Sequence, residues 1–366
     1  MNLGTKTLLA IFSTSFRTPV RFYYNNIRIM QTVTLSQTND SMPTIGLGTW
    51  QLQAPSNVIE PTVLKALELG YRHIDTAFNY NNEEAIGAAV NEWINSGKGS
   101  RKDLFITTKL PHVGNRASDV RKFVELQLTK LNMDYIDLYL IHVPFAFVCD
   151  PEALTPVVNS DGDYLLDVTT NHCEIWKVME ECQREGLIRN LGLSNFNEDQ
   201  IKKIMDKASV LPQVLQVELH ASFQQQQLRK FCAVNNIVVT AYAPLGSPGA
   251  KDHFVNKYKY SPDAFPDILG LPIVQEIADK HGKTPAQVLL HFLVKQDIVA
   301  IPKSTSEHRL KENMEIYDFE LSEEDMNRLK KLDKGEDGRI FNFLFWKGVE
   351  KHPEYPFKLP PQVIKE

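Results

Sequence analysis

The chain has 366 residues, which is enough for one large domain or two of ordinary size. Its hydrophobic content of 43% and charged content of 23% are typical of a soluble globular protein, and its net charge of −5 argues against a broad nucleic-acid-binding surface. No apolar run is long enough to cross a membrane. The four cysteines show neither CxxC nor zinc-type spacing, so we expect reduced thiols in an intracellular protein.

Residues 1–30 differ in composition from the rest of the chain. They contain no acidic residue, and the first acid is Asp40. Their basic residues are Lys6, Arg17, Arg21 and Arg28. A basic, acid-free start is typical of mitochondrial presequences, but it also fits a disordered extension or a start codon upstream of the true one at Met30. We expect residues 1–30 to be a disordered or targeting extension and residues 31–366 to form one domain. A cytoplasmic location is expected, with mitochondrial import as the alternative.

The pattern becomes regular after Met30. Two short apolar stretches flank the turn-like residues 39–41, which predicts a small β-hairpin. Short apolar runs then alternate with amphipathic stretches of helix length. The eight apolar runs are 45–48, 71–74, 104–108, 136–141, 187–193, 214–217, 237–241 and 298–301. The predicted helices are 61–69, 83–95, 117–131, 174–185, 198–207, 224–235, 272–281 and 285–296.

This alternation predicts the fold class. Strictly alternating strands and helices imply a parallel sheet, and eight such units imply a closed (β/α)₈ barrel, a TIM barrel, as a single domain. The alternative is an open Rossmann sheet, supported by Gly46-Leu47-Gly48. That motif is incomplete, because Gln51 stands where the third glycine should be and no helix is predicted to begin there. We therefore expect the barrel.

Four polar residues follow three neighbouring strands of the predicted barrel. Asp75 ends the second strand and Tyr80 follows it, while Lys109 ends the third and His142 the fourth. The active site of such a barrel lies at the carboxyl ends of its strands, so we expect these side chains to meet. Taken singly, each has a structural explanation as a helix cap, a core tyrosine or a hydrogen-bonded histidine. Four of them at one rim favour catalysis.

These four residue types suit the reduction of a carbonyl group. Hydride addition to C=O produces an alkoxide, which takes a proton, and Tyr80 can donate it. The pKa of a free tyrosine is near 10, and the cation of Lys109 would lower it. A buried lysine needs a carboxylate partner, which Asp75 supplies. His142 would orient the carbonyl oxygen. These residues account for the candidate ligands, so we expect no metal site.

Several longer segments resemble one known family. They are residues 70–77 with Tyr80, residues 108–110, residues 140–144, residues 192–196 and residues 301–304. In this order they resemble the aldo-keto reductase family, aldose and aldehyde reductases in particular, from about residue 33 to 357. The resemblance implies a barrel whose C-terminal tail covers the mouth, with NADPH/NADP⁺ as the cofactor.

The resemblance also implies which residues hold that cofactor. Ser194, Asn195 and Gln216 match positions that hold the nicotinamide amide, and Tyr242 matches the tyrosine that stacks on its ring. Leu245 and Ser247 match the loop over the pyrophosphate, Lys303, Ser304 and Arg309 the clamp on the 2′-phosphate, and Glu312 and Asn313 the adenine contacts. Charge supports the clamp independently, because two cations after a strand suit a phosphate better than a bare ribose diol.

The chain departs from the family pattern near the expected cofactor loop and substrate pocket. Gln51 and Gly249 occupy positions where many relatives carry a lysine and an aspartate that close the loop, and residues 249–271 form a longer loop than usual. Val143 follows the histidine where aldose reductase-like members have tryptophan, which would reshape the pocket. Trp50 is present and is expected to line it. The tail aromatics line the mouth or pack outside the barrel: Phe341, Phe343, Phe345, Trp346, Tyr355 and Phe357.

The predicted function is NADPH-dependent reduction of aldehydes or ketones, with Tyr80 as proton donor. We expect a small-molecule carbonyl substrate, no nucleic-acid or membrane partner, and a monomer. Reduction of a steroid C=C bond is disfavoured, because relatives with that activity carry glutamate in place of His142. The remaining alternative is a catalytically silent, NADP(H)-binding or structural member of the same fold.

Overall fold

A computed structural model describes residues 31–50 and 56–358. The predicted extension at residues 1–30 and the position of Gln51 lie outside the described residues. A small antiparallel hairpin of β1 (Thr32–Thr34) and β2 (Ser41–Pro43) begins the described chain, as predicted. It covers the amino-terminal ends of the central strands, where Leu35 and Met42 pack with Phe105, Val214 and Val299.

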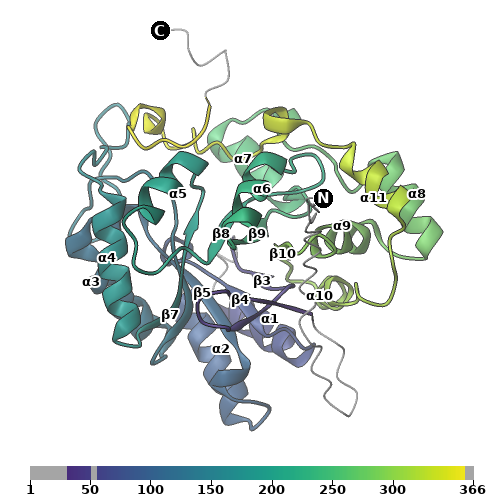
Figure 1. The fold of residues 1–366 in the computed structure, drawn as a ribbon, viewed down its shortest axis with the longest axis horizontal. Helices are drawn as coiled ribbons and strands as arrows, with labels where there is room; N and C mark the ends of the chain where they lie inside the picture. Colours follow the sequence, from purple (N-terminus) through teal and green to yellow (C-terminus); the bar gives the residue numbers. More distant parts are fainter. Residues whose placement is uncertain (1–30, 51–55, 359–366) are drawn as a thin grey trace, which may run out of the picture.

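Within the described residues, eight parallel strands form one curved sheet in chain order (Figure 1). They are β3 (Leu47–Gly48), β4 (His73–Asp75), β5 (Phe105–Leu110), β6 (Ile136–Ile141), β7 (Ile188–Ser194), β8 (Val214–Glu218), β9 (Val238–Tyr242) and β10 (Val299–Ala300). A parallel bridge between Ile45 and Ala300 joins the two edges, and the Ala300 amide donates to the Thr44 carbonyl at 2.8 Å. The predicted (β/α)₈ barrel is confirmed.

A ring of helices surrounds the sheet. It consists of α1 (Ser56–Glu68), α2 (Glu83–Asn95), α3 (Ala117–Leu131), α4 (His172–Arg184), α5 (Glu198–Met205), α6 (Gln226–Val234), α9 (Pro285–Val294) and α10 (Glu307–Met314). Contacts between α10 and α1 complete the ring. The predicted helix 272–281 is α8 (Pro272–His281), which packs on the outside against α9, and α11 (Glu323–Lys330) packs against α8. The eighth helix of the ring is therefore α10, which follows the last strand.

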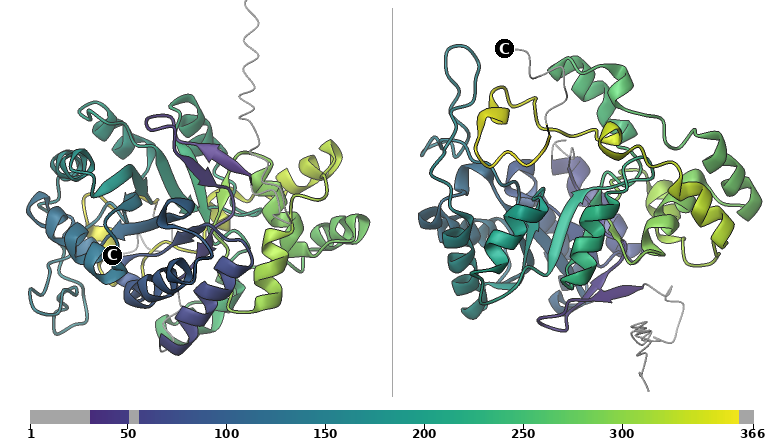
Figure 2. Two further views of the ribbon diagram at one scale, coloured as in Figure 1. Left: turned by 90° about the horizontal axis from the view of Figure 1, so that it is seen from below. Right: turned by 45° about the horizontal axis from the view of Figure 1, so that its top comes forward.

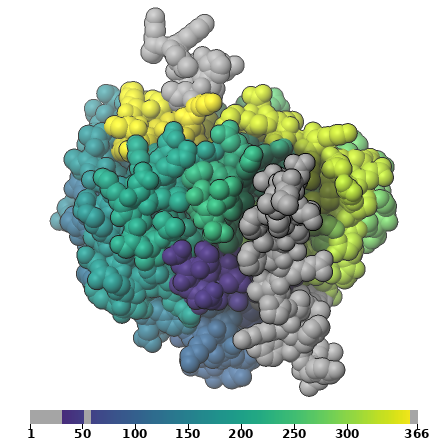
Figure 3. All heavy atoms as spheres, in the orientation of Figure 1, coloured from purple at the N-terminus to yellow at the C-terminus, as the bar shows by residue number. Residues whose placement is uncertain are grey.

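The C-terminal segment crosses the end of the barrel opposite the hairpin. The right view of Figure 2 shows this segment in yellow and the hairpin in purple. Phe341 contacts Tyr242 at the end of β9, and Phe343 contacts Phe145 beyond the end of β6. In the space-filling view this segment packs along the top of the molecule (Figure 3). The tail therefore covers the carboxyl ends of the strands, the face where a barrel carries its site.

Candidate active site

The four residues predicted to act together come from three neighbouring strands and the turn after β4. The strands are almost completely buried, so their polar side chains are held by the barrel interior and not by solvent. The Lys109 Nζ lies 2.6 Å from the Asp75 Oδ1 and donates to the Thr76 carbonyl at 2.8 Å. Breaking such a buried pair by removing one partner costs about 3–5 kcal/mol.

A short 3₁₀ turn brings Tyr80 over this pair. The turn η1 (Phe78–Tyr80) ends at Asn81, whose φ of 52° lies in the left-handed region that asparagine tolerates. The next residue, Asn82, accepts from the Thr76 hydroxyl at 2.6 Å and donates to the Thr49 carbonyl at 3.0 Å. These bonds fix the turn against the ends of β3 and β4, so the Tyr80 ring has a defined place.

The tyrosine, lysine and histidine side chains meet at this point. The Lys109 Nζ is 5.0 Å from the centre of the Tyr80 ring, and the ring centres of Tyr80 and His142 are 5.6 Å apart at 77°. The structure therefore brings Asp75, Tyr80, Lys109 and His142 into one cluster, as the strand ends predicted.

The pKa of Tyr80 is shifted in the direction opposite to the one expected. Burial, followed by the negative charge of Asp75, raises the pKa of Tyr80 well above its usual value near 10. The net shift is opposite to the lowering expected from Lys109, because burial dominates it. Burial and then the Lys109 charge lower the pKa of His142 well below its usual value. The site thus holds a neutral phenol and a neutral imidazole near pH 7.

The predicted nicotinamide contacts lie on the next three strands. Ser194 ends β7 and stands opposite Gln216 of β8 in the register. The Asn195 amide donates to the His142 carbonyl at 2.9 Å and to the Ser194 hydroxyl at 3.1 Å, and its oxygen accepts from the Tyr242 hydroxyl at 2.9 Å. These side chains form a continuous polar edge beside His142.

Gln216 connects this edge to the cluster of Asp75, Tyr80, Lys109 and His142. Its amide nitrogen donates to the Asp75 Oδ2 at 2.7 Å. Among the described residues nothing donates to its own amide oxygen, although the residue is only 2% exposed. An amide oxygen that accepts from no described residue can accept from a bound amide NH₂, which is the group that a nicotinamide carboxamide presents.

The predicted phosphate clamp follows β10. Within the described part of the chain, neither Lys303 nor Arg309 forms an ion pair. Burial lowers the pKa of the Lys303 ammonium. The Ser304 hydroxyl accepts from the Ser306 amide at 3.1 Å, and Ser306 caps α10, which carries Arg309. The strand β3 approaches closely here, since a Cβ on Gly48 would lie 2.5 Å from the Ile301 carbonyl. Two unpaired cations beside a helix start fit an anionic phosphate.

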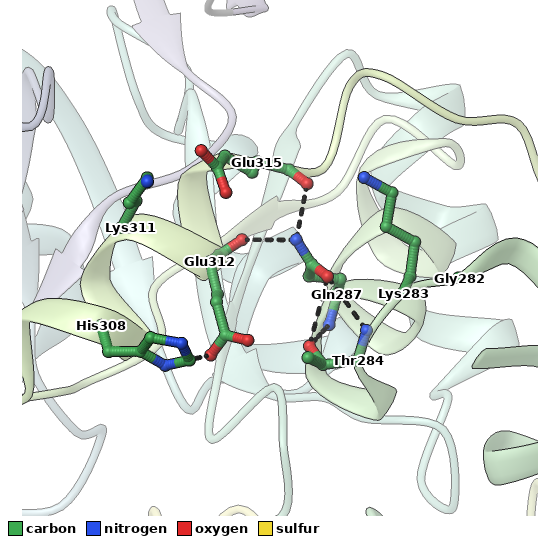
Figure 4. A pocket seen from close by; sticks show the side chains of 8 residues that line it. All are labelled: Gly282, Lys283, Thr284, Gln287, His308, Lys311, Glu312 and Glu315. Atoms are coloured by element: carbon green, nitrogen blue, oxygen red, sulfur yellow. Dashed lines mark hydrogen bonds and ion pairs between the residues drawn. The ribbon is translucent and has the colours of Figure 1, made fainter. Parts of the chain in front are cut away.

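The predicted adenine contacts lie on the last turn of α10. Asn313 is buried beside Tyr71. Glu312 lines a pocket of about 470 Å³ between α9 and α10, together with Gln287, His308 and Lys311 (Figure 4). The Glu312 carboxylate lies 3.2 Å from the His308 Nδ1 and remains on the surface of the pocket. The loop residues Leu245 and Ser247 are half-buried after β9, where Ser247 precedes the turn η4 (Pro248–Ala250).

The comparisons with known proteins agree with this geometry. A profile described as Aldo/keto reductase family matches residues 44–334, most of the chain. The chain belongs to the aldo-keto reductase family. It is 39% identical to the human aldo-keto reductase family 1 member A1 over 332 residues, which cover 89% of this chain and 98% of the relative. The zebrafish (Danio rerio) member A1-A is 39% identical over 335 residues, covering 90% and 99% of the two chains.

A solved structure supports the same assignment. The aldose reductase of Schistosoma japonicum superposes with a TM-score of 0.79 at 39% identity, over 90% of this chain and 99% of that one. Members of the family are oxidoreductases that generally use NAD(P)H and act on small carbonyl substrates. This aldo-keto reductase is similar to the aldose and aldehyde reductases among them.

On the substrate side, aromatic residues surround the mouth of this aldo-keto reductase. Trp50 packs against Phe341 of the tail at 5.8 Å and against Phe254 at 5.9 Å. Phe254 belongs to α7 (Lys251–Tyr258), a helix within the long loop after β9. Val143 is 2% exposed and packs in the main core, so the described conformation leaves little of it open to a substrate.

The tail aromatics divide into two groups. Phe341 and Phe345 pack on Phe254, whereas Trp346 packs on His112 and Phe147 beyond β5 and β6. Phe343 links the groups through Phe345 and Trp346 and also contacts Phe357, which in turn contacts Tyr355. The tail is therefore an aromatic strap over the mouth, with its first part nearest Tyr242.

A buried polar network behind Lys109 was not predicted. The Glu83 Oε1 accepts from the Thr108 hydroxyl at 2.6 Å and from the Gln127 amide at 2.7 Å. Gln127 also donates to the Lys109 carbonyl at 3.2 Å, and its oxygen accepts from the Tyr139 hydroxyl at 2.7 Å. Burial raises the pKa of Glu83. Gln127 could have indicated this network from the sequence, because it lies on the otherwise apolar face of the predicted helix 117–131.

The described residues contain neither a metal-binding cluster nor a membrane-spanning helix. Among the described residues, no cluster of three or more His, Cys, Asp and Glu side chains is arranged to hold a metal ion. In the same part of the chain, no helix has both the length and the apolar character to span a membrane.

Proposed function

We propose that this aldo-keto reductase is an NADPH-dependent reductase of aldehydes or ketones in which Tyr80 donates the proton. The observation that carries the proposal is the placing of a neutral Tyr80 phenol beside the buried Lys109–Asp75 pair and 5.6 Å from the ring of His142. The names of the relatives agree with it, since they include aldose reductase and family 1 member A1.

The chain offers a separate group for each part of the cofactor. Ser194, Asn195 and Gln216 would hold the carboxamide, with Tyr242 against the ring. Leu245 and Ser247 would lie over the pyrophosphate. The 2′-phosphate would bind to Lys303, Ser304 and Arg309, and the adenine to Glu312 and Asn313. When bound, the reduced nicotinamide supplies the hydride. The absence of ion-pair partners for Lys303 and Arg309 among the described residues favours the phosphorylated cofactor.

The residues around the substrate carbonyl would then orient it and transfer the proton. His142, a neutral imidazole, positions the carbonyl oxygen by a hydrogen bond. As hydride adds to the carbonyl carbon, the oxygen becomes an alkoxide and takes the phenol proton of Tyr80. The products are an alcohol and a phenolate, and the Lys109 ammonium 5.0 Å from the ring stabilises that phenolate. Asp75 holds the ammonium in place, and the Gln216 amide in turn holds Asp75.

The test is Tyr80→Phe, which removes only the hydroxyl group. We expect kcat to fall by at least about a hundredfold, as for the loss of a general acid, while NADPH binding stays unchanged. Tyr135→Phe is the matched control, because Tyr135 precedes β6 at the other end of the barrel. NADPH absorbance would be followed with a panel of aldehydes, ketones, quinones and sugars. Full activity of the Tyr80→Phe variant contradicts the assignment, and binding of NADPH without turnover by the native protein indicates a silent member of the family.

A further inference from the structure

A buried carboxylate that the proposed mechanism does not use lies two residues beyond Gln216. Glu218 ends β8, and it is 1% exposed. Its Oε1 accepts from the Ile340 amide at 2.7 Å and from the His220 Nε2 at 3.0 Å, and its Oε2 accepts from the Phe341 amide at 2.8 Å. Both carboxylate oxygens are thus committed to the start of the C-terminal tail.

The hydrogen-bond partners of Glu218 indicate its role. A buried charge is costly unless hydrogen bonds compensate it, and here three N–H donors converge on it. Among the described residues no lysine or arginine pairs with Glu218. Two of the three donors are consecutive backbone amides, so a shift of the tail by one residue would break the contact. The carboxylate therefore fixes the register of the tail on the end of β8.

The residues placed in this way form the wall of the mouth. Phe341 meets Trp50 edge to face at 5.8 Å and lies 6.1 Å from the Tyr242 ring. The next residue, Asn342, accepts from the Tyr260 hydroxyl of the long loop at 2.9 Å. The Glu218 carboxylate on β8 thus fixes the position of the tail. The tail in turn contacts both Trp50 after β3 and the loop after β9.

We propose that Glu218 is a positioning residue that sets substrate selectivity: by holding the Ile340 and Phe341 amides, it keeps the Phe341 ring against Trp50 as an aromatic wall for the substrate. The inference rests on the proposed reductase function. It assigns no chemical step to Glu218, which acts through Phe341. A fixed aromatic wall favours flat aromatic aldehydes over small aliphatic ones, because a ring can pack on it and a short chain cannot.

The experiment compares Glu218→Gln with Glu336→Gln. Glu336 is an exposed tail carboxylate whose only ion-pair partner among the described residues is the nearby Arg339, so it controls for charge loss in the same segment. The measured quantity is the ratio of kcat/KM for benzaldehyde to kcat/KM for propanal, with NADPH. For Glu218→Gln we expect this ratio to fall about fivefold, mainly through a higher KM for benzaldehyde. The kcat with propanal and the affinity for NADPH stay within about twofold, and Glu336→Gln changes none of these.

Two further variants test the route through Phe341. Phe341→Ala should lower the ratio by a similar factor, and the double variant should lower it no further, because both changes remove the same wall. If Glu218→Gln is insoluble, Glu218→Asp keeps the charge but shortens its reach, and the same fall is expected. An unchanged ratio in a folded variant, or equal losses for both aldehydes, overturns the inference.

Failure of the proposed function can be told apart from failure of this inference. If the native protein oxidises no NADPH with any carbonyl, the reductase assignment fails and selectivity has no meaning. The anchoring of the tail is then read by limited proteolysis. Faster cleavage between residues 336 and 350 in Glu218→Gln than in Glu336→Gln supports the anchor, and equal rates contradict it.

Discussion

We propose that the charges of Lys303 and Arg309 decide between the two nicotinamide cofactors. With no ion-pair partner among the described residues, each is free to bind a phosphate. We expect Lys303→Met or Arg309→Met to raise the Kd for NADPH roughly tenfold or more, since a charge-assisted contact contributes about 1.5–3 kcal/mol. The Kd for NADH should change little. Quenching of protein fluorescence measures both constants.

The control for this prediction is Lys330→Met, an exposed lysine on α11 outside the proposed clamp. It should leave both constants unchanged. Equal losses of NADPH and NADH affinity in the Lys303 or Arg309 variants would mean that these cations do not bind the 2′-phosphate.

The sequence predicted those site residues that the order of the strands brings together, and it missed those whose role depends on burial. Asp75, Lys109 and His142 lie at or next to the ends of their strands, and the barrel brings strand ends together, so their meeting follows from topology. Glu83 and Glu218 matter through burial and through partners distant in sequence, such as Gln127 and Phe341. No local pattern marks such partners. The raised pKa of Tyr80 likewise depends on burial, which the residue types alone did not reveal.

Among the elements, the long loop after β9 makes aromatic contacts that the sequence did not predict. Gln51 and Gly249 replace the lysine and aspartate that close this loop in many relatives, so that ion pair is not available here. Gln51 lies outside the described residues, but the loop contains α7, whose Phe254 is 1% exposed between Trp50 and Phe341. The Tyr260 hydroxyl adds a bond to Asn342 of the tail. Aromatic packing therefore holds the loop in the described conformation.

We accordingly expect Phe254→Ala to speed release of NADP⁺ several-fold. The substitution removes a large buried ring from the contact between α7 and the tail, which costs about 3–5 kcal/mol when a phenylalanine is truncated in a packed core. A lid that opens faster shifts rate limitation toward hydride transfer. The primary isotope effect on kcat with NADPH deuterated at C4 should therefore rise, and stopped-flow release should quicken.

Lys257→Ala provides the control for the loop, because Lys257 is exposed on the same helix. Its release rate and isotope effect should match those of the native protein. An isotope effect already well above unity in the native protein, unaltered by Phe254→Ala, would show that the loop does not limit turnover.

Sequence periodicity predicted the long helices well but missed three short ones. The bounds of α2, α3 and α8 agree with prediction, because each has a clear apolar face and a stop signal. The helices α7, α10 and α11 were missed, since each has eight residues and few apolar ones. Their positions depend on packing against the barrel, the tail or α8, which outweighs weak local preference.

For the whole molecule, closing a barrel around polar strand ends buries several histidines without their charges. Burial lowers the pKa of His73 to about 4 and that of His112 to about 3. The pKa of His142 also falls well below its usual value near 6.5. Below pH 6.5 the unfolded chain binds protons at these positions and the folded chain does not. The free energy of unfolding must therefore fall as the pH drops from 6.5 toward 4.

The size of this effect is testable at one residue. Between pH 7 and pH 5, a histidine with a folded pKa of about 3 or 4 lowers the free energy of unfolding by about 2 kcal/mol. The His112 Nδ1 has no partner among the described residues, and the ring packs against Phe147 and Trp346. His112→Phe should therefore cost little stability at pH 7, because it removes an unsatisfied polar atom and keeps a ring of similar shape. Urea unfolding of both proteins at pH 7 and pH 5 should show that the loss on acidification is about 2 kcal/mol smaller in the variant. An equal loss in both proteins would mean that His112 binds its proton in the folded state, and that its surroundings open to water more readily than the closed aromatic strap implies.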